Sequence, residues 1–146
     1  MSGAIPCHKI WEGTSHLAFL SSHPNTQGFS VVIPKKHLSS YVFSQQQDDI
    51  NELMCASKEV GLLLDRALDG VARTGMIFEG YGVDHLHAKL FPMHGTGGSS
   101  EFRKISSSID KYFDRYEGYI SSHDGKQEDY DKLVKLAAHI RSFIHT

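Results

Sequence analysis

Cysteines and long apolar runs are scarce in this sequence. Among 146 residues only Cys7 and Cys55 are cysteines, and they lie far apart and form no C-x-x-C pattern. This scarcity favours free thiols in a reducing compartment over a disulfide framework. No run approaches the ~18 apolar residues of a membrane span, and no charged start precedes an apolar stretch of signal-peptide length. We therefore expect a soluble cytoplasmic protein with no membrane partner.

An excess of charge of one sign is also missing. The 15 Lys and Arg residues against 17 Asp and Glu residues leave a formal net charge of -2. This balance gives no general electrostatic reason to bind DNA, RNA or an acidic membrane, so any anion site must be local. The composition, 40% hydrophobic and 22% charged, is typical of a globular protein, and the length fits one domain.

Three strands are predicted within the first 34 residues. Residues 8–11 and 17–20 are two short strand-like runs on either side of a Gly-containing turn, a pattern typical of a hairpin. Residues 28–33 are the strongest β stretch, and Pro34 is expected to stop it because proline has no backbone donor. Residues 35–37 add three basic groups at the strand end, where loops often carry function.

Helical periodicity marks two later segments. Apolar residues recur at intervals of three and four through residues 45–72, which predicts a long helix packed on the core, and residues 128–145 predict a closing helix. Residues 75–78 predict a strand between them, and residues 79–82 a Gly-rich turn into a further strand. This order favours an α+β fold with an antiparallel sheet over a doubly wound fold.

The further strand lies within residues 83–95 and carries the main functional pattern. Polar and apolar residues alternate from His85 to Leu90, a period of two that predicts a strand with one buried face. The side chains of His85, His87 and Lys89 would then share the other face at intervals of about 6.5 Å. Pro92 is expected to end the strand. Three basic groups on one face favour an anionic ligand.

Three explanations compete for these groups. A His-x-His metal site is common for zinc or iron, but an ammonium cannot coordinate and Asp84 would alternate to the other face, so a third ligand is lacking. The second explanation is that these histidines have no function and that neighbouring groups satisfy their hydrogen bonds. The third is a phosphate site, in which imidazoles and an ammonium neutralise charge and an imidazole attacks phosphorus. His87, with a basic neighbour on each side, is then the candidate nucleophile.

The motif resembles the signature of the histidine triad (HIT) superfamily, in which histidines alternate with apolar residues: here His85-Leu86-His87-Ala88-Lys89-Leu90-Phe91. Residues 28–37 resemble the family's glycine, apolar strand and proline-lysine-x-histidine segment, and residues 8–12 and 17–20 resemble its first two strands. The resemblance covers about residues 7–95 of the printed sequence.

The resemblance implies an α+β fold with a five-stranded antiparallel sheet and a long helix. The family's closing region is not matched by residues 96–146, where the periodicity predicts a C-terminal helical extension. Residues 1–95 would form the nucleotide-binding core, and residues 96–146 a linker and helical extension packed on the same domain. A homodimer with a shared sheet is implied as well. Within the extension, residues 95–100 are a flexible linker by composition. Three tyrosines follow at helical spacing, which favours core or dimer packing over base stacking: Tyr112, Tyr116 and Tyr119.

The activity implied is binding of a purine nucleotide, often of adenosine type, and cleavage at its α-phosphate. The family cleaves dinucleoside polyphosphates, such as diadenosine tetraphosphate, or nucleoside phosphoramidates, or transfers nucleotides, through a nucleotidyl-histidine. By position His87 would be the nucleophile, with His85 and His37 beside the phosphate. Ile10 and Phe19 would line the base and ribose pocket. No nucleic acid polymer is expected as a partner.

The sequence departs from the family pattern at the third histidine, which is Lys89. A lysine keeps the positive charge but does not readily shuttle a proton near neutral pH. Phe78 stands where the family often has asparagine, and Glu79 or Tyr81 is a candidate substitute. The cysteine pair of zinc-bearing members is absent, so we expect no metal and no cofactor. A non-catalytic nucleotide-binding module with the same fold is the alternative to a hydrolase.

Overall fold

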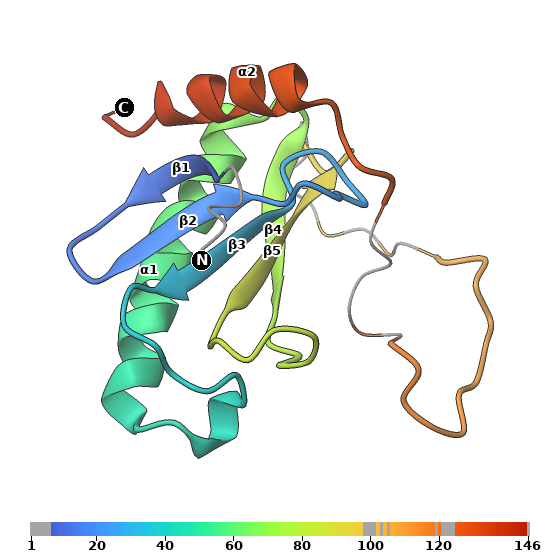
Figure 1. Ribbon diagram of the computed structural model, residues 1–146. Helices are drawn as coiled ribbons and strands as arrows, with labels where there is room; N and C mark the ends of the chain where they lie inside the picture. Colours follow the sequence, from blue (N-terminus) through green and yellow to red (C-terminus); the bar gives the residue numbers. More distant parts are fainter. Residues whose placement is uncertain are drawn as a thin grey trace.

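The computed structural model describes residues 7–97, 102, 104, 106–118, 120 and 125–145. It contains five strands (Figure 1), namely β1 (His8–Glu12), β2 (His16–Leu20), β3 (Ser30–Pro34), β4 (Val71–Ile77) and β5 (Ala88–His94). They form one antiparallel sheet in the order β1-β2-β3-β5-β4. Two α-helices, α1 (Gln47–Ala67) and α2 (Tyr130–Arg141), and a short 3-10 helix (Val42–Ser44) complete the described elements. The predicted α+β class and five-stranded antiparallel sheet are confirmed.

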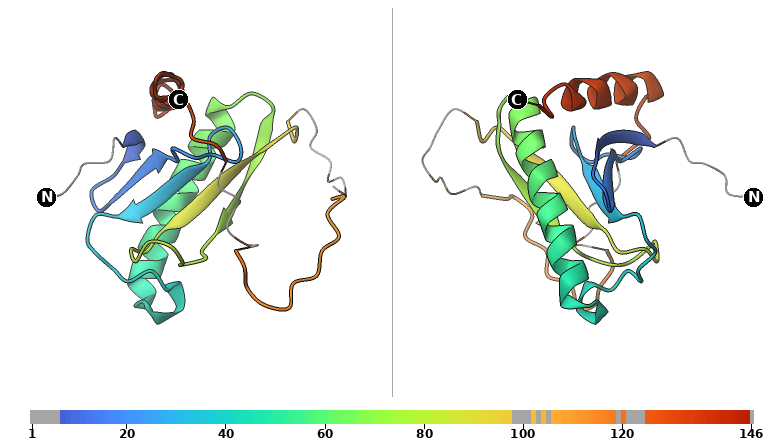
Figure 2. Two further views of the ribbon diagram at one scale, coloured as in Figure 1. Left: turned by 45° about the vertical axis from the view of Figure 1, so that its right-hand side comes forward. Right: turned by 90° about the vertical axis from the view of Figure 1, so that its left-hand side faces the viewer.

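Helix α1 lies along one face of the sheet (Figure 2). Its buried residues recur at the spacing of one helical face: Leu53, Ala56, Ser57, Val60, Leu63, Leu64 and Ala67. Alternate strand residues pack into the same core, among them Ala18, Leu20, Val32, Ala88 and Leu90. Each large aliphatic side chain buried in this way contributes roughly 1.5–3 kcal/mol. The residues that alternate with them face the opposite side of the sheet, which α1 leaves open.

Helix α2 packs against β1 and α1 and adds to the same core. Leu133, Ala137 and Ile140 are its buried residues. The side chain of Asp129 accepts a hydrogen bond from the backbone N–H of Lys132 at 3.0 Å, which caps the first turn. The division of the chain into residues 1–95 and residues 96–146 stays a prediction.

The long helix ends earlier than the periodicity predicted. It was expected to reach residue 72, but α1 ends at Ala67 and β4 begins at Val71. Gly70 separates them with φ of +76°, a left-handed conformation that glycine adopts without strain. Leu68 and Val71 are both buried, and their spacing of three fits a helical stripe, although they reach the core from a turn and a strand. The expected helix end was therefore wrong.

The histidine strand also has different limits. β5 begins at Ala88, so residues 85–87 precede the strand. Pro34, the last residue of β3, has no N–H to donate to a partner strand. The N–H of Leu86 donates to the carbonyl oxygen of Leu38 at 2.8 Å, and the carbonyl oxygen of Pro34 is contacted by Nε2 of His85 at 2.9 Å.

Pro92 does not end β5 but lies inside it. β3 pairs with β5 only from Ala88 to Leu90, and beyond that point β5 has a partner only in β4. Proline is tolerated where one side of a strand is unpaired, because no ladder bond is lost there. The expected strand end at Pro92 was therefore wrong.

The segment before α2 differs from its prediction as well. The described residues between 102 and 120 form no helix, so the packing of Tyr112 and Tyr116 on one helical face is wrong. Tyr112 is exposed, whereas Tyr116 reaches the open face of the sheet. Tyr119 lies outside the described residues, as do residues 98–100 of the predicted linker.

Candidate active site

The open face of the sheet carries a cavity of about 690 Å³, a size that suits a small organic ligand. Residues from β2, β3 and β5, from the β4–β5 connection and from the segment before α2 line it: Phe19, Val31, Ile33, Glu79, Tyr81, Gly82, Val83, His85, His87, Lys89, Tyr116 and Gly118. The alternation in the sequence therefore brings both histidines and the lysine to one cavity.

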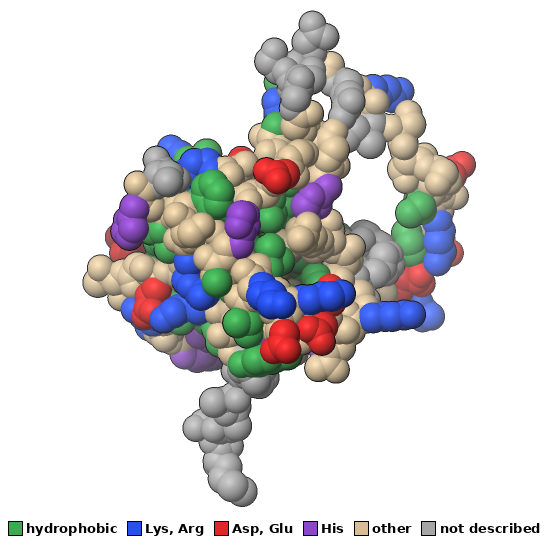
Figure 3. All heavy atoms as spheres, turned by 90° about the horizontal axis from the view of Figure 1, so that it is seen from above, with side chains coloured by type: hydrophobic (Ala, Val, Ile, Leu, Met, Phe, Trp, Pro, Cys, Tyr) green, Lys and Arg blue, Asp and Glu red, His purple; other side chains and the backbone are tan. Residues whose placement is uncertain are grey.

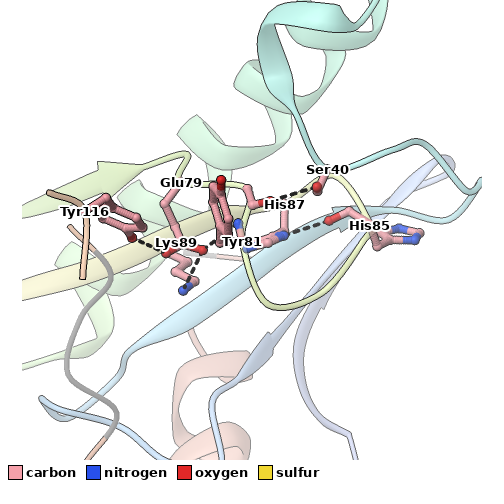
Figure 4. A network of polar contacts seen from close by, with 8 residues as sticks. Ser40, Glu79, Tyr81, His85, His87, Lys89 and Tyr116 are labelled. Carbon is pink, nitrogen blue, oxygen red and sulfur yellow. Dashed lines mark hydrogen bonds and ion pairs between the residues drawn. The ribbon is translucent and has the colours of Figure 1, made fainter. Parts of the chain in front are cut away.

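His87 is fixed in one tautomer by the backbone. Its side chain is buried, and Nδ1 lies 2.7 Å from the carbonyl oxygen of His85 (Figure 4). A carbonyl oxygen can only accept, so Nδ1 carries the proton and donates it. The lone pair of the neutral ring is then on Nε2. This arrangement prepares Nε2 to act as a nucleophile.

His85 and His37 form a pair beside His87. Nε2 of His85 lies 2.9 Å from the carbonyl oxygen of Pro34 and donates to it, so Nδ1 of His85 holds the lone pair. That Nδ1 lies 3.3 Å from Nδ1 of His37, which therefore donates. His37 is exposed and is not among the residues that line the cavity, so it reaches the site through His85.

Two loops hold this histidine pair together. The N–H of Ser40 donates to Oδ1 of Asp84 at 2.9 Å, and its hydroxyl donates to the carbonyl oxygen of Gly80 at 2.8 Å. Gly80 has φ of +72°, and a Cβ at this position would lie 3.0 Å from the carbonyl oxygen of Ser40. Glycine is thus required both by the backbone conformation and by the close approach of the loop that carries His37.

Lys89 and Glu79 form an ion pair on the other side of His87 (Figure 4). Nζ of Lys89 lies 3.8 Å from Oε1 of Glu79, and the two side chains are 16% and 4% exposed. The Glu79 carboxylate also accepts from the backbone N–H of Tyr81 at 2.8 Å and from the hydroxyl of Tyr116 at 3.1 Å. Two hydrogen-bond donors and one ion pair therefore hold this carboxylate in place at the cavity wall.

The remaining wall of the cavity is apolar and aromatic. Phe19 of β2 and Val31 of β3 are paired across the two strands, and Ile33 lies two residues further along the same face. The rings of Tyr81 and Tyr116 lie with their centroids 5.7 Å apart at the opposite side. A ligand with a planar or apolar part and an anionic part fits this combination of walls.

Two of the predicted binding residues do not line the cavity. Ile10 is fully buried in the core, next to a register shift between Lys9 and Trp11 in β1. Phe78 packs against the core, because neighbouring residues point to opposite sides and Glu79 takes the cavity side. Phe19 and Glu79 line the cavity and Ile10 and Phe78 do not, and the binding roles of all four stay a prediction.

Several other residues of the cavity wall were not predicted, among them Val31, Ile33 and Tyr116. Val31 and Ile33 were predictable, since they alternate with the buried Val32 and must face the other side of the sheet. Tyr116 had no such signal, because it lies far along the chain in a segment without regular structure.

On the face seen from above α2, both basic and acidic side chains are exposed (Figure 3). Among the described residues, no group of three or more His, Cys, Asp or Glu side chains could hold a metal ion. No helix in the same part of the chain has the length and apolar character to cross a membrane.

Known proteins are similar to this chain in sequence. No family model matches the chain. It is 30% identical over 113 residues to an uncharacterized HIT-like protein of Methanocaldococcus jannaschii, covering 73% of this chain and 85% of that protein. It is 28% identical over 92 residues to adenosine 5'-monophosphoramidase of Schizosaccharomyces pombe, covering 63% of this chain and 68% of that protein.

A solved structure has the same fold. It is a hypothetical histidine triad nucleotide-binding protein from Sulfolobus tokodaii, with a TM-score of 0.70 and 23% identity over 96% of this chain and 85% of that one. Together with the similarity to the Methanocaldococcus jannaschii protein, this defines the class: the chain belongs to the histidine triad family.

Proposed function

We propose that the chain binds a purine nucleotide, of adenosine type, in the cavity and cleaves it at the α-phosphate through a nucleotidyl intermediate on His87. The observation that carries this proposal is the hydrogen bond from Nδ1 of His87 to the carbonyl oxygen of His85, which leaves the Nε2 lone pair for attack. The relatives support it, because one is named an adenosine 5'-monophosphoramidase and another a nucleotide-binding protein.

The reaction has two displacement steps. Nε2 of His87 attacks the α-phosphorus, the N–P bond forms, and the bond to the leaving group breaks with its electron pair on the leaving atom. A water oxygen then attacks the same phosphorus, the N–P bond breaks, and its electron pair returns to Nε2. The water loses a proton to solvent, and a nucleoside monophosphate is released. Replacement of that water by another phosphate acceptor would give a nucleotidyl transfer.

The surrounding residues have distinct roles in this proposal. Lys89 borders the cavity on one side of His87 and stabilises the negative charge that develops on the phosphoryl oxygens. His85 borders it on the other side, and its carbonyl oxygen holds the Nδ1 proton of His87. His37 supports His85 through the contact between their Nδ1 atoms. Phe19, with Val31 and Ile33 beside it, provides an apolar wall for the nucleoside.

The proposal includes a homodimer and a division of the chain into a nucleotide-binding core and a C-terminal extension. β4 is an edge strand in the described sheet, so a second copy could add there and extend it into the shared sheet of a homodimer. Residues 1–95 would carry the nucleotide site, with residues 96–146 as an extension that reaches back to it through Tyr116. Cys7 and Cys55 are free and exposed, which suits a reducing compartment such as the cytoplasm.

Replacement of the nucleophile tests the proposed reaction. We expect His87→Asn to lower kcat/KM for diadenosine tetraphosphate and for adenosine 5'-phosphoramidate about 10³-fold or more, while AMP still binds. His94→Asn is the matched control, because His94 is exposed at the far end of β5 and is not a lining residue of the cavity. Full activity of the His87 variant would rule out the nucleophile assignment.

A non-catalytic nucleotide-binding module is the second candidate. The observation that favours it is the replacement of the third histidine by Lys89, which is already engaged with Glu79. Binding of AMP by the wild-type chain without turnover of any substrate in a nucleotide panel would support this candidate over the hydrolase.

A further inference from the structure

We propose that Lys89, held by Glu79, makes this site selective for substrates whose leaving group is a phosphate oxyanion, and poor toward those whose leaving group is an amine. Phosphoanhydrides, such as dinucleoside polyphosphates, would thus be cleaved in preference to phosphoramidates. This inference rests on the proposed cleavage at the α-phosphate and adds the chemical class of the leaving group.

The two imidazoles of the motif have no proton to give to a leaving group. The N–H of His87 is on Nδ1 and donates to the carbonyl oxygen of His85 at 2.7 Å, and its Nε2 is the attacking atom. The N–H of His85 is on Nε2 and donates to the carbonyl oxygen of Pro34 at 2.9 Å. Of the three motif side chains, Lys89 is therefore the donor left to meet the departing group.

Lys89 differs from a histidine in the proton chemistry that it offers. An ammonium has three donors and no acceptor, and lysine side chains release a proton poorly near neutral pH, where histidine exchanges one readily. Nζ of Lys89 pairs with the Glu79 carboxylate at 3.8 Å. The side chain is therefore suited to stabilise an anion electrostatically and poorly suited to transfer a proton.

Glu79 is the positioning residue for this ammonium. Its carboxylate is 4% exposed and accepts from the N–H of Tyr81 and the hydroxyl of Tyr116, so it cannot move freely. These contacts come from the β4–β5 connection and from the segment before α2, which together fix where Lys89 meets the cavity.

The two leaving groups make different demands. When a phosphoanhydride is cleaved, the P–O bond breaks with its electron pair on the bridging oxygen, and the leaving phosphate departs as an anion that an ammonium stabilises without proton transfer. When a phosphoramidate is cleaved, the P–N bond breaks with its electron pair on nitrogen. That nitrogen must gain a proton to leave as a neutral amine, so a general acid is needed. Among the three motif side chains, Lys89 meets the first demand, and none has a proton placed to meet the second.

A pair of substrates with the same nucleoside and α-phosphate isolates the leaving group. We expect wild-type kcat/KM to be about 10²-fold higher for diadenosine tetraphosphate than for adenosine 5'-phosphoramidate. Lys89→His should shift this ratio at least about tenfold toward the phosphoramidate, because an imidazole can give a proton. Lys89→Arg, which keeps the charge, should retain the wild-type preference, and Lys89→Gln should lose anhydride turnover.

The pH profile and the Glu79 variant add readouts that a purely structural role would not move. Between about pH 7 and about pH 9, Lys89→His should lose activity toward the phosphoramidate with rising pH, as expected of a histidine acid. Glu79→Gln should lower kcat for the anhydride more than it raises KM. The substitution displaces the Lys89 ammonium, which acts on the leaving group, and leaves the apolar wall that binds the nucleoside unchanged. Thermal unfolding of each variant identifies any that fails to fold. If a variant fails to fold, the substrate preference of Lys89→Arg is compared with that of the wild-type chain.

Two outcomes would overturn the inference and are distinguishable. A wild-type preference for the phosphoramidate, or an unchanged ratio in Lys89→His, would overturn the leaving-group selectivity and leave the proposed cleavage intact. Turnover of neither substrate by the wild-type chain would overturn both the selectivity and the proposed cleavage.

Discussion

The close contact between Gly80 and Ser40 predicts the effect of an alanine at position 80, and Gly82→Ala is its control. Gly80 and Gly82 lie in the same connection and have φ of +72° and +91°, so alanine is strained at both positions. A left-handed alanine is destabilising by about 1–2 kcal/mol. Only at position 80 does the added Cβ meet a neighbour, the carbonyl oxygen of Ser40 at 3.0 Å, whereas nothing lies within 4 Å at position 82. Any difference in stability between the two variants therefore measures the loop contact.

We expect Gly82→Ala to lower the free energy of unfolding by about 1 kcal/mol and Gly80→Ala by about 2 kcal/mol. Gly80→Ala should also lower kcat/KM more than Gly82→Ala does, because it pushes apart the loops that bring His37 to His85. Urea unfolding and steady-state turnover measure both effects. Equal losses in stability for the two variants, or unchanged kcat/KM in Gly80→Ala, would refute the claim that the close approach at Gly80 positions the histidine pair.

Two further predictions concern the rest of the fold. Asp129→Ala should lower the free energy of unfolding by about 1 kcal/mol by removing the cap of α2, whereas Asp114→Ala, at an exposed position, should have little effect in the same urea titration. Burial, followed by the charge of Lys36, lowers the pKa of His16 below its ordinary value of 6.5, although Glu52 and Asp49 oppose this. The unfolded chain then binds a proton that the folded chain does not, so stability should be full above about pH 6.5 and fall as the pH drops below it. His16→Asn should flatten this slope, and an unchanged slope would contradict the assignment.

The sheet was predictable because its signals are local. Alternation predicted β2 and β3 to within one or two residues of their limits. The same period of two predicted which residues are buried and which line the cavity: Leu86, Ala88 and Leu90 are buried, and His85, His87 and Lys89 line the cavity. Both faces of the histidine segment were correct although its residues 85–87 lie outside the strand.

The errors arose where a tertiary contact decides the outcome. Leu68 and Val71 fit a helical spacing, and only the turn at Gly70 assigns them to different elements. Pro92 is compatible with β5 because the pairing between β3 and β5 stops at Leu90. The residues around Pro92 do not indicate where the partner strand stops. Tyr116 joins the site through Glu79, which no local pattern connects to it.

The nucleotidyl intermediate itself is the most direct test of the proposed chemistry. The wild-type chain would be mixed with excess diadenosine tetraphosphate, quenched in alkali during turnover, and examined by intact mass and by peptide mapping. We expect one adenylyl group per chain, attached to His87, and none in His87→Asn. An adenylyl group on another residue, or continued turnover in which no labelled chain accumulates or can be chased into AMP, would contradict the assignment of His87 as the nucleophile.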